Sequence, residues 1–73
     1  MRVFIKFLNG KSITLYLEQN MTILDIKKQI EEIEDIKVED QLFVYSGEKL
    51  DNYRDYQNCN IKSNSIIHLI IRN

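Results

Sequence analysis

The side chains best suited to covalent or metal chemistry in this sequence are its one cysteine, Cys59, and its one histidine, His68. A structural zinc site takes four such ligands, and a nucleophilic cysteine needs a neighbouring base or another means of lowering its pKa. Cys59 stands in Gln57-Asn58-Cys59-Asn60, a polar stretch that is typical of a loop, and lies far along the chain from His68. We therefore expect Cys59 to be a buried structural thiol and His68 to be part of a contact surface.

Other catalytic motifs are also missing from the sequence. It contains no glycine-rich phosphate loop, no Ser/His/Asp set and no pair of carboxylates that predicts a cleft for acid–base catalysis. The acidic run Glu31-Glu32-Ile33-Glu34-Asp35 is most simply the solvated end of a helix. We expect no enzymatic activity, no cofactor and no metal ion.

Composition narrows the class of protein further. The chain has 73 residues, a net charge of −1 and a single cysteine, so it is predicted to form one domain without an internal disulfide. It shows neither a secretory segment nor an apolar run long enough to span a membrane, and its charges form no basic stripe for nucleic acid. We expect a monomer in the cytoplasm or nucleus, with no nucleic-acid or membrane partner.

The elements that must position these residues begin with a β-hairpin. From Met1 to Phe7, apolar residues recur at every second position, as in a half-buried strand, and the same period follows from Ser12 to Leu17. Between them, Leu8-Asn9-Gly10-Lys11 contains the Asn-Gly pair of a type I′ turn, in which both central residues have positive φ. The sequence thus predicts two antiparallel strands joined by that turn.

A helix is predicted after the hairpin. Thr22-Ile23-Leu24-Asp25 matches a capping box, in which the side chains of Thr22 and Asp25 accept hydrogen bonds from amides at the helix start. Asp35 is the expected left-handed residue at the other end. Isoleucines recur between them at helical spacing and form an apolar face opposite charged residues: Ile23, Ile26, Ile30 and Ile33 opposite Lys27, Lys28, Glu31 and Glu32.

The second half of the chain is predicted to contain three strands and a loop. Gln41–Tyr45 is a short apolar strand, Glu48–Leu50 a brief edge strand and Ile66–Arg72 the last strand, while residues 51 to 64 form a loop anchored by Ile61. The resulting order of elements is strand, strand, helix, strand, short strand, strand. It predicts an α+β fold in two layers, with one sheet face under the helix and the other face open.

The open face of this sheet is expected to be apolar. A solvated sheet face normally shows a polar residue at every second position. In the last strand, however, Ile67, Leu69 and Ile71 alternate with Ile66, His68, Ile70 and Arg72, and in the third strand Leu42 and Val44 point outward if Phe43 and Tyr45 point inward. An apolar cluster with basic neighbours, here Lys6, Lys49, His68 and Arg72, is typical of a protein-binding surface. The alternative is that the loop from 51 to 64 covers these residues, or that they are ordinary scattered apolar surface.

Four stretches together resemble the ubiquitin family: MRVFIKFLNGKSITL, TILDIKKQI, YSGEKLDNYR and NIKSNSIIHLIIR. The similarity runs from end to end without a gap, so residues 1–73 resemble a single ubiquitin-like domain. It implies the β-grasp fold, a mixed sheet packed on one amphipathic helix. It also implies a recognition patch for ubiquitin-binding domains and proteasomal receptors, and a secondary patch. The first is made of Leu8, Leu42, Val44, Gly47, His68 and Ile70, and the second lies around Ile36 and Ile71.

Some positions depart from the modifiers of this family, which end in a Gly-Gly tail that is activated and joined to lysines. Here Arg72 is followed by Asn73 and the glycines are absent, so the chain as given cannot be conjugated. Leu42 replaces a basic residue that the activating enzyme of ubiquitin contacts. The stretches MRVFIKF and QNCNIKSNSIIHLI instead resemble the ubiquitin-like domain of parkin.

The resemblance therefore favours a ubiquitin-like domain that is not conjugated and that forms the N-terminal part of a longer protein. Such a domain would recruit the proteasome or another ubiquitin receptor, or bind a domain of its own host protein. The alternative is a divergent covalent modifier whose Gly-Gly tail is absent from the sequence given. A third interpretation is a mimic that occupies ubiquitin receptors without being conjugated.

Overall fold

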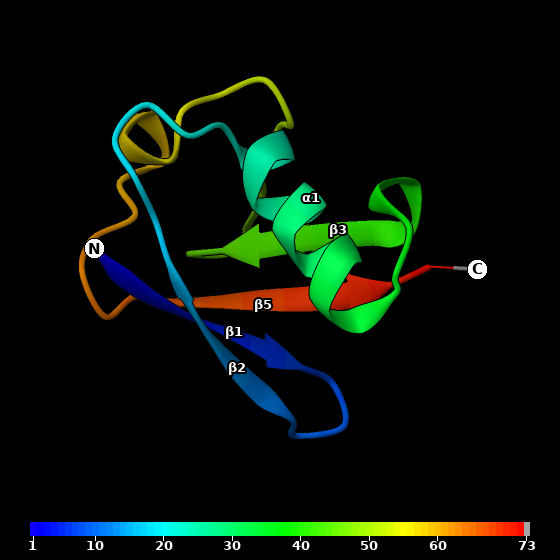
Figure 1. Cartoon of the computed structure of the whole chain (residues 1–73). Helices are drawn as coiled ribbons and strands as arrows, with labels where there is room; N and C mark the ends of the chain where they lie inside the picture. The colour runs from blue at the N-terminus through cyan, green and yellow to red at the C-terminus, as the bar shows by residue number, and fades with distance from the viewer. Residues whose placement is uncertain (73) are drawn as a thin grey trace.

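The computed structural model describes residues 1–72, in which one α-helix lies across one face of a five-stranded sheet (Figure 1). The strands lie in the order β2-β1-β5-β3-β4, with β1 and β5 parallel and the other neighbouring pairs antiparallel. The predicted α+β fold with a mixed sheet is confirmed. In chain order the elements are β1 (Arg2–Phe7), β2 (Ser12–Tyr16), α1 (Ile23–Glu34), the 3₁₀ turn η1 (Val38–Asp40), β3 (Gln41–Tyr45), β4 (Glu48–Lys49), the 3₁₀ turn η2 (Tyr56–Cys59) and β5 (Ile66–Ile71).

Both ends of α1 form as the sequence predicts. The Thr22 hydroxyl accepts a hydrogen bond from the Asp25 amide at 3.2 Å, and the Asp25 carboxylate accepts one from the Thr22 amide at 3.0 Å. At the other end Asp35 is left-handed, with φ 57° and ψ 41°, and its amide donates to the Glu31 carbonyl at 2.9 Å. These bonds satisfy backbone groups that a helix otherwise leaves without partners at its ends.

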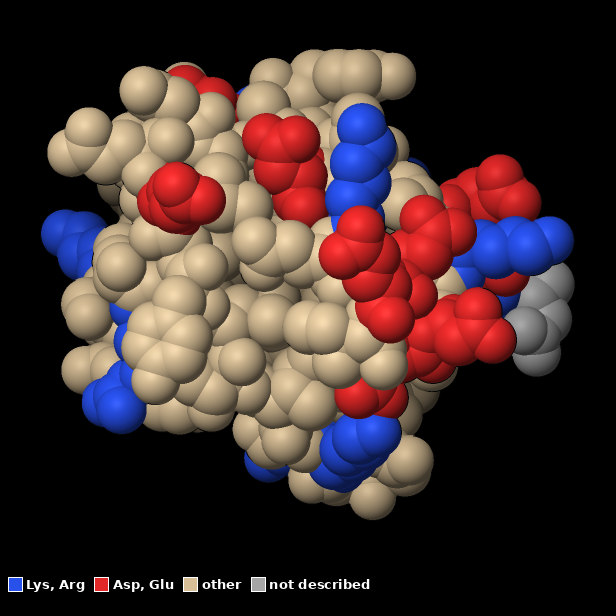
Figure 2. All heavy atoms as spheres, in the orientation of Figure 1, with Lys and Arg blue, Asp and Glu red and all other residues tan. Residues whose placement is uncertain are grey.

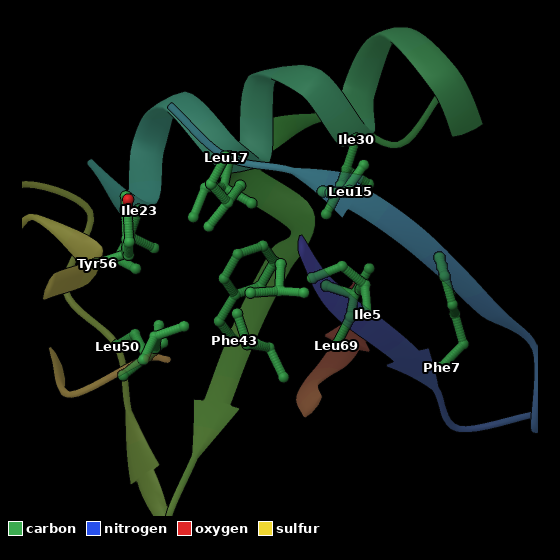
Figure 3. Packing of buried hydrophobic residues seen from close by; sticks show 14 residues of the cluster. Ile5, Phe7, Leu15, Leu17, Ile23, Ile30, Phe43, Leu50, Tyr56 and Leu69 are labelled. Atoms are coloured by element: carbon green, nitrogen blue, oxygen red, sulfur yellow. The ribbon is translucent and has the colours of Figure 1, made fainter. Parts of the chain in front are cut away.

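The hydrophobic core lies between α1 and the sheet, with Phe43 of β3 near its centre (Figure 3). Ile5 of β1 and Leu69 of β5 lie beside Phe43, and Ile23 and Ile30 reach the core from the helix. All five side chains are essentially inaccessible to solvent. Burying one such side chain contributes about 1.5–3 kcal/mol. The packing of the apolar side of α1 therefore holds this helix on the sheet.

The buried side of α1 is rotated relative to the sequence prediction. Ile33 was expected on the apolar face but is 58% exposed, whereas Lys27, expected on the charged face, is only 5% exposed. Successive residues turn by about 100° around a helix, so these two positions lie on opposite edges of the stripe formed by Ile23, Ile26 and Ile30. Contact with the sheet selects the edge that carries Lys27, and the prediction for Ile33 was wrong.

The turn between β1 and β2 also differs from the prediction. Gly10 has a φ of 91°, but Asn9 is not among the residues with positive φ, so the turn is not of type I′. The Gly10 amide donates to the Phe7 carbonyl at 3.1 Å, and the Phe7 amide donates to the Lys11 carbonyl at 2.8 Å. This is the longer hairpin loop in which a left-handed glycine follows the turn. The Asn9 side chain favours it by accepting from the Lys11 amide at 2.9 Å.

The loop from 51 to 64 is attached to the core at two points, not at Ile61 alone. Tyr56 and Ile61 are each 3% exposed. The Tyr56 amide donates to the Met21 carbonyl at 3.1 Å, and the Ile61 amide donates to the Tyr56 carbonyl at 3.2 Å. The turn η2 therefore directs Tyr56 inward. The sequence around Tyr56 gave no sign of this inward direction, because a 3₁₀ turn follows neither the strand period nor the helix period.

Two isoleucines of α1 provide a matched test of the core. We expect Ile30→Ala to lower the free energy of unfolding by about 2–5 kcal/mol, because it leaves a cavity in the core. Ile33→Ala, in the same helix, should change it by no more than about 0.5 kcal/mol, because the side chain is exposed. Urea unfolding followed by circular dichroism measures both. Similar losses in the two variants would contradict the packing described above.

The capping box predicts a pH dependence of stability. The pKa of the Asp25 carboxyl lies below its ordinary value of 3.8, first because the Thr22 amide and then because the Thr22 hydroxyl stabilises the carboxylate. A group whose pKa is lower in the folded state stabilises the fold above its unfolded pKa, and this contribution is lost as the pH falls through the folded pKa. We expect Asp25→Asn to lose less stability than the unaltered chain between about pH 5 and about pH 2. Equal losses in urea unfolding would show that the carboxylate contributes nothing.

Candidate functional site

The face of the sheet opposite α1 carries an apolar cluster across β3 and β5. Strand register places Leu42 opposite Ile70 and Val44 opposite His68. Because Phe43 faces the helix, alternation along β3 turns Leu42 and Val44 to the other face. Leu42, Val44 and Ile70 are partly exposed and His68 is exposed. We call Leu42, Val44, His68 and Ile70 the open-face patch.

The other two residues of the expected recognition patch lie in turns between strands. Leu8, in the hairpin turn, is 80% exposed, and Gly47 has a φ of 77° in the turn between β3 and β4. Leu8 lines a shallow hollow of about 190 Å³ together with Ile71 of the expected secondary patch. Ile36 is instead half-buried against the core. The structure thus brings Leu8 next to Ile71, and the binding role of both patches stays a prediction.

Three basic residues were expected beside the patch. Lys6 lies opposite His68 in the parallel pair of β1 and β5, and Lys49 lies opposite Val44 in β4. Arg72 follows β5, and its amide donates to the Asp40 carbonyl at 2.7 Å. All three side chains are exposed. Lys6 and Lys49 are thus cross-strand neighbours of patch residues.

Sequence reasoning missed a hollow of about 560 Å³ beside the open-face patch. We call it the side hollow. Its lining includes Leu42, which also belongs to the patch, and residues from segments far apart in the chain: Lys27, Val38, Lys49, Leu50, Tyr53 and Arg72. Leu42, Lys49 and Arg72 were expected at the patch from the sequence, whereas Lys27 and Tyr53 were not placed beside them.

The opposite side of the molecule has a different character. Seen from the side of α1, acidic side chains gather where that helix ends, and much of the remaining surface in this view is uncharged (Figure 2). The last turn of α1 contains no basic residue. Glu34 nevertheless forms an ion pair with Lys11, which ties the helix end to the hairpin. The acidic end and the open-face patch therefore lie on different faces.

Cys59 and His68 are the side chains that the sequence singled out for covalent or metal chemistry. Cys59 is half-buried at the end of η2, and burial raises the pKa of its thiol, which disfavours the thiolate. No group of three or more His, Cys, Asp or Glu side chains in residues 1–72 could hold a metal ion. Nor does this range contain a helix with the length and apolar character needed to cross a membrane.

The comparison with known families agrees with this geometry. The sequence model of the ubiquitin family matches residues 3–73. The chain belongs to the ubiquitin family. Its mixed sheet, packed on one helix, is accordingly a ubiquitin-like β-grasp, as the resemblance implied.

The relatives include proteins of similar length to this chain and one that is much longer. Ubiquitin-like protein 1 of Schizosaccharomyces pombe is 28% identical over 71 residues, and NEDD8-like protein RUB3 of Arabidopsis thaliana is 34% identical over 71 residues. Each match covers 97% of this chain and 91% of the relative. The E3 ubiquitin-protein ligase parkin of Mus musculus is 24% identical over 72 residues, which cover 99% of this chain but 16% of parkin. The similarity to parkin thus extends well beyond the two stretches noticed in the sequence.

The raised pKa of Cys59 predicts a slow thiol. At about pH 7.5 its thiolate fraction should be below that of an unperturbed cysteine, so alkylation by iodoacetamide should be slower in the folded chain than in urea. Mass spectrometry of timed samples measures the two rates, with free cysteine in each solution as the control for the effect of urea on the reagent. A faster reaction in the folded chain would instead indicate an activated nucleophile.

Proposed function

We propose that this member of the ubiquitin family is a non-catalytic protein-binding domain that engages ubiquitin-binding domains or proteasomal receptors. The observation that carries the proposal is the open-face patch. Its apolar side chains come from adjacent strands and are partly exposed on the sheet face opposite α1. Partly exposed apolar side chains with a polar rim are typical of the centre of a protein interface.

The register of the sheet supports a contact surface, not chance exposure. Leu42 and Ile70 are direct cross-strand neighbours, and so are Val44 and His68. Side chains opposite one another in neighbouring strands are about 4.5–5.5 Å apart at their Cβ atoms, so the four form one continuous surface. Lys6 and Lys49 flank it and would orient a partner of opposite charge.

Covalent attachment to other proteins is the alternative function. The relatives include two small ubiquitin-like proteins as well as parkin, so they do not favour attachment over binding.

We also infer that the domain works in the cytoplasm or nucleus, in a pathway of protein degradation, and that it is carried by a longer protein. The free thiol of Cys59 is compatible with such a reducing compartment.

Alanine substitutions in the open-face patch test the proposed function. We expect Val44→Ala and Ile70→Ala each to weaken binding of a synthetic helical ubiquitin-interacting motif peptide by about 1–3 kcal/mol, because both remove apolar contact area at the interface. Isothermal titration calorimetry measures the affinities. Both side chains lie outside the core, so the circular dichroism spectrum should not change.

Ile66→Ala is the matched control for Ile70→Ala. Ile66 is 51% exposed and lies on the same strand and the same face, opposite Phe4 and not opposite β3. Its substitution should leave the affinity unchanged. If the peptide fails to bind the unaltered chain, or if all three variants bind equally well, the patch is not its receptor surface.

A further inference from the structure

The side hollow gathers three positive charges that form no ion pair within residues 1–72. Lys27, Lys49 and Arg72 all line it. Within residues 1–72 the single ion pair joins two other residues, so no carboxylate described there lies within 4.0 Å of these three cations. Glu39 and Asp51 also line the hollow, and they leave an excess of one positive charge among its lining residues. A hollow of this charge is complementary to a single negative group.

Lys27 is the most constrained of the three cations. It is 5% exposed, its Nζ donates to Asn52 Oδ1 at 2.6 Å, and the same nitrogen lies 5.4 Å from the centre of the Phe43 ring. Burial lowers the pKa of Lys27, and the charges of Lys49 and Arg72 lower it further, against a smaller opposing effect of Asp51. A buried ammonium held only by neutral groups is costly, and a nearby anion would offset this cost.

The same hollow also presents apolar surface. Val38, Leu42 and Leu50 contribute aliphatic side chains, and Tyr53, which is 81% exposed, contributes an aromatic ring. Leu42 connects this surface to the open-face patch, because it is the cross-strand neighbour of Ile70. A ligand that fills the hollow therefore needs apolar as well as negative groups, and it lies next to whatever covers the patch.

We propose that the side hollow binds an acidic side chain of the partner that covers the open-face patch, with an apolar side chain beside it. The carboxylate accepts hydrogen bonds from Lys49 and Arg72, which are exposed, and its charge stabilises Lys27 behind them. The apolar side chain packs on Leu42 and Tyr53. The place of this segment within a larger partner rests on the proposed function, whereas the affinity of the hollow for acidic and apolar groups does not.

A carboxylate fits the hollow better than a phosphate group does. Glu39 and Asp51 in the lining oppose a dianion more strongly than a single negative charge. The aliphatic lining would also remain uncovered beneath a phosphate alone, whereas a peptide segment supplies both kinds of group. A partner segment with one acidic side chain beside apolar ones is therefore the occupant that the lining favours.

Two tetrapeptides with blocked ends test the hollow on its own. Acetyl-Leu-Glu-Gln-Leu-amide and acetyl-Leu-Gln-Gln-Leu-amide differ by a single carboxylate, and amide chemical shifts in NMR spectra report where each binds. We expect the glutamate peptide to shift the amides of Leu42, Lys49 and Tyr53 in a saturable way. Its affinity should exceed that of the glutamine peptide by roughly threefold to tenfold, as two exposed ion pairs predict.

Charge variants complete the test. The double variant Lys49→Gln, Arg72→Gln should bind both peptides equally weakly, whereas Lys28→Gln, Lys62→Gln, which removes the same charge elsewhere, should behave like the unaltered chain. Equal binding of the two peptides to the unaltered chain, the absence of saturable shifts at these amides, or an equal loss in both double variants would overturn the inference.

Val44→Ala should leave the tetrapeptide response unchanged. A chain that binds the tetrapeptide but no receptor peptide would therefore refute the proposed function without refuting the acid-binding hollow.

Discussion

A single helix covers one face of a five-stranded sheet, and the rest of the structure depends on this constraint. Strand alternation sends Phe43 and Leu69 under α1 and, by the same geometry, turns Leu42, His68 and Ile70 to the opposite face. Residues on the covered face determine stability, because they lose nearly all their contact with water. Residues on the open face contribute little to the core, so their chemistry is less constrained by the stability of the fold.

A buried amide fixes how α1 sits on the sheet. Gln41 of β3 is 2% exposed, and its Nε2 donates to the backbone carbonyls of Lys27 at 2.9 Å and of Ile36 at 3.0 Å. These bonds hold both the middle of the helix and the segment after it against β3. They also bring Lys27 over Phe43, at the inner edge of the side hollow. The same contact that orients the helix therefore places a cation where the core meets the surface.

Local patterns in the sequence were sufficient for most of the fold. The capping box at Thr22 and the alternation in the strands depend on neighbours along the chain, and both formed as expected. The exchange of Ile33 for Lys27 on the buried edge of α1 could not be predicted in this way, because the edge is selected by contact with the sheet. Tyr56 was missed for a related reason, since its inward direction depends on a backbone bond to Met21.

The open-face patch and the side hollow also differ in how far local sequence patterns predict them. Alternation within two strands is enough to predict that Leu42 and Ile70 face outward together. The side hollow joins Lys27 of the helix, Tyr53 of a loop and Arg72 after the last strand. No single stretch of sequence therefore indicates it. Because its cations are exposed or held by neutral groups, a change at Lys49 or Arg72 alters the charge met by a partner while the packing around Phe43 stays intact. Under the two proposals, binding preference therefore varies at the edge of the sheet without cost to the core.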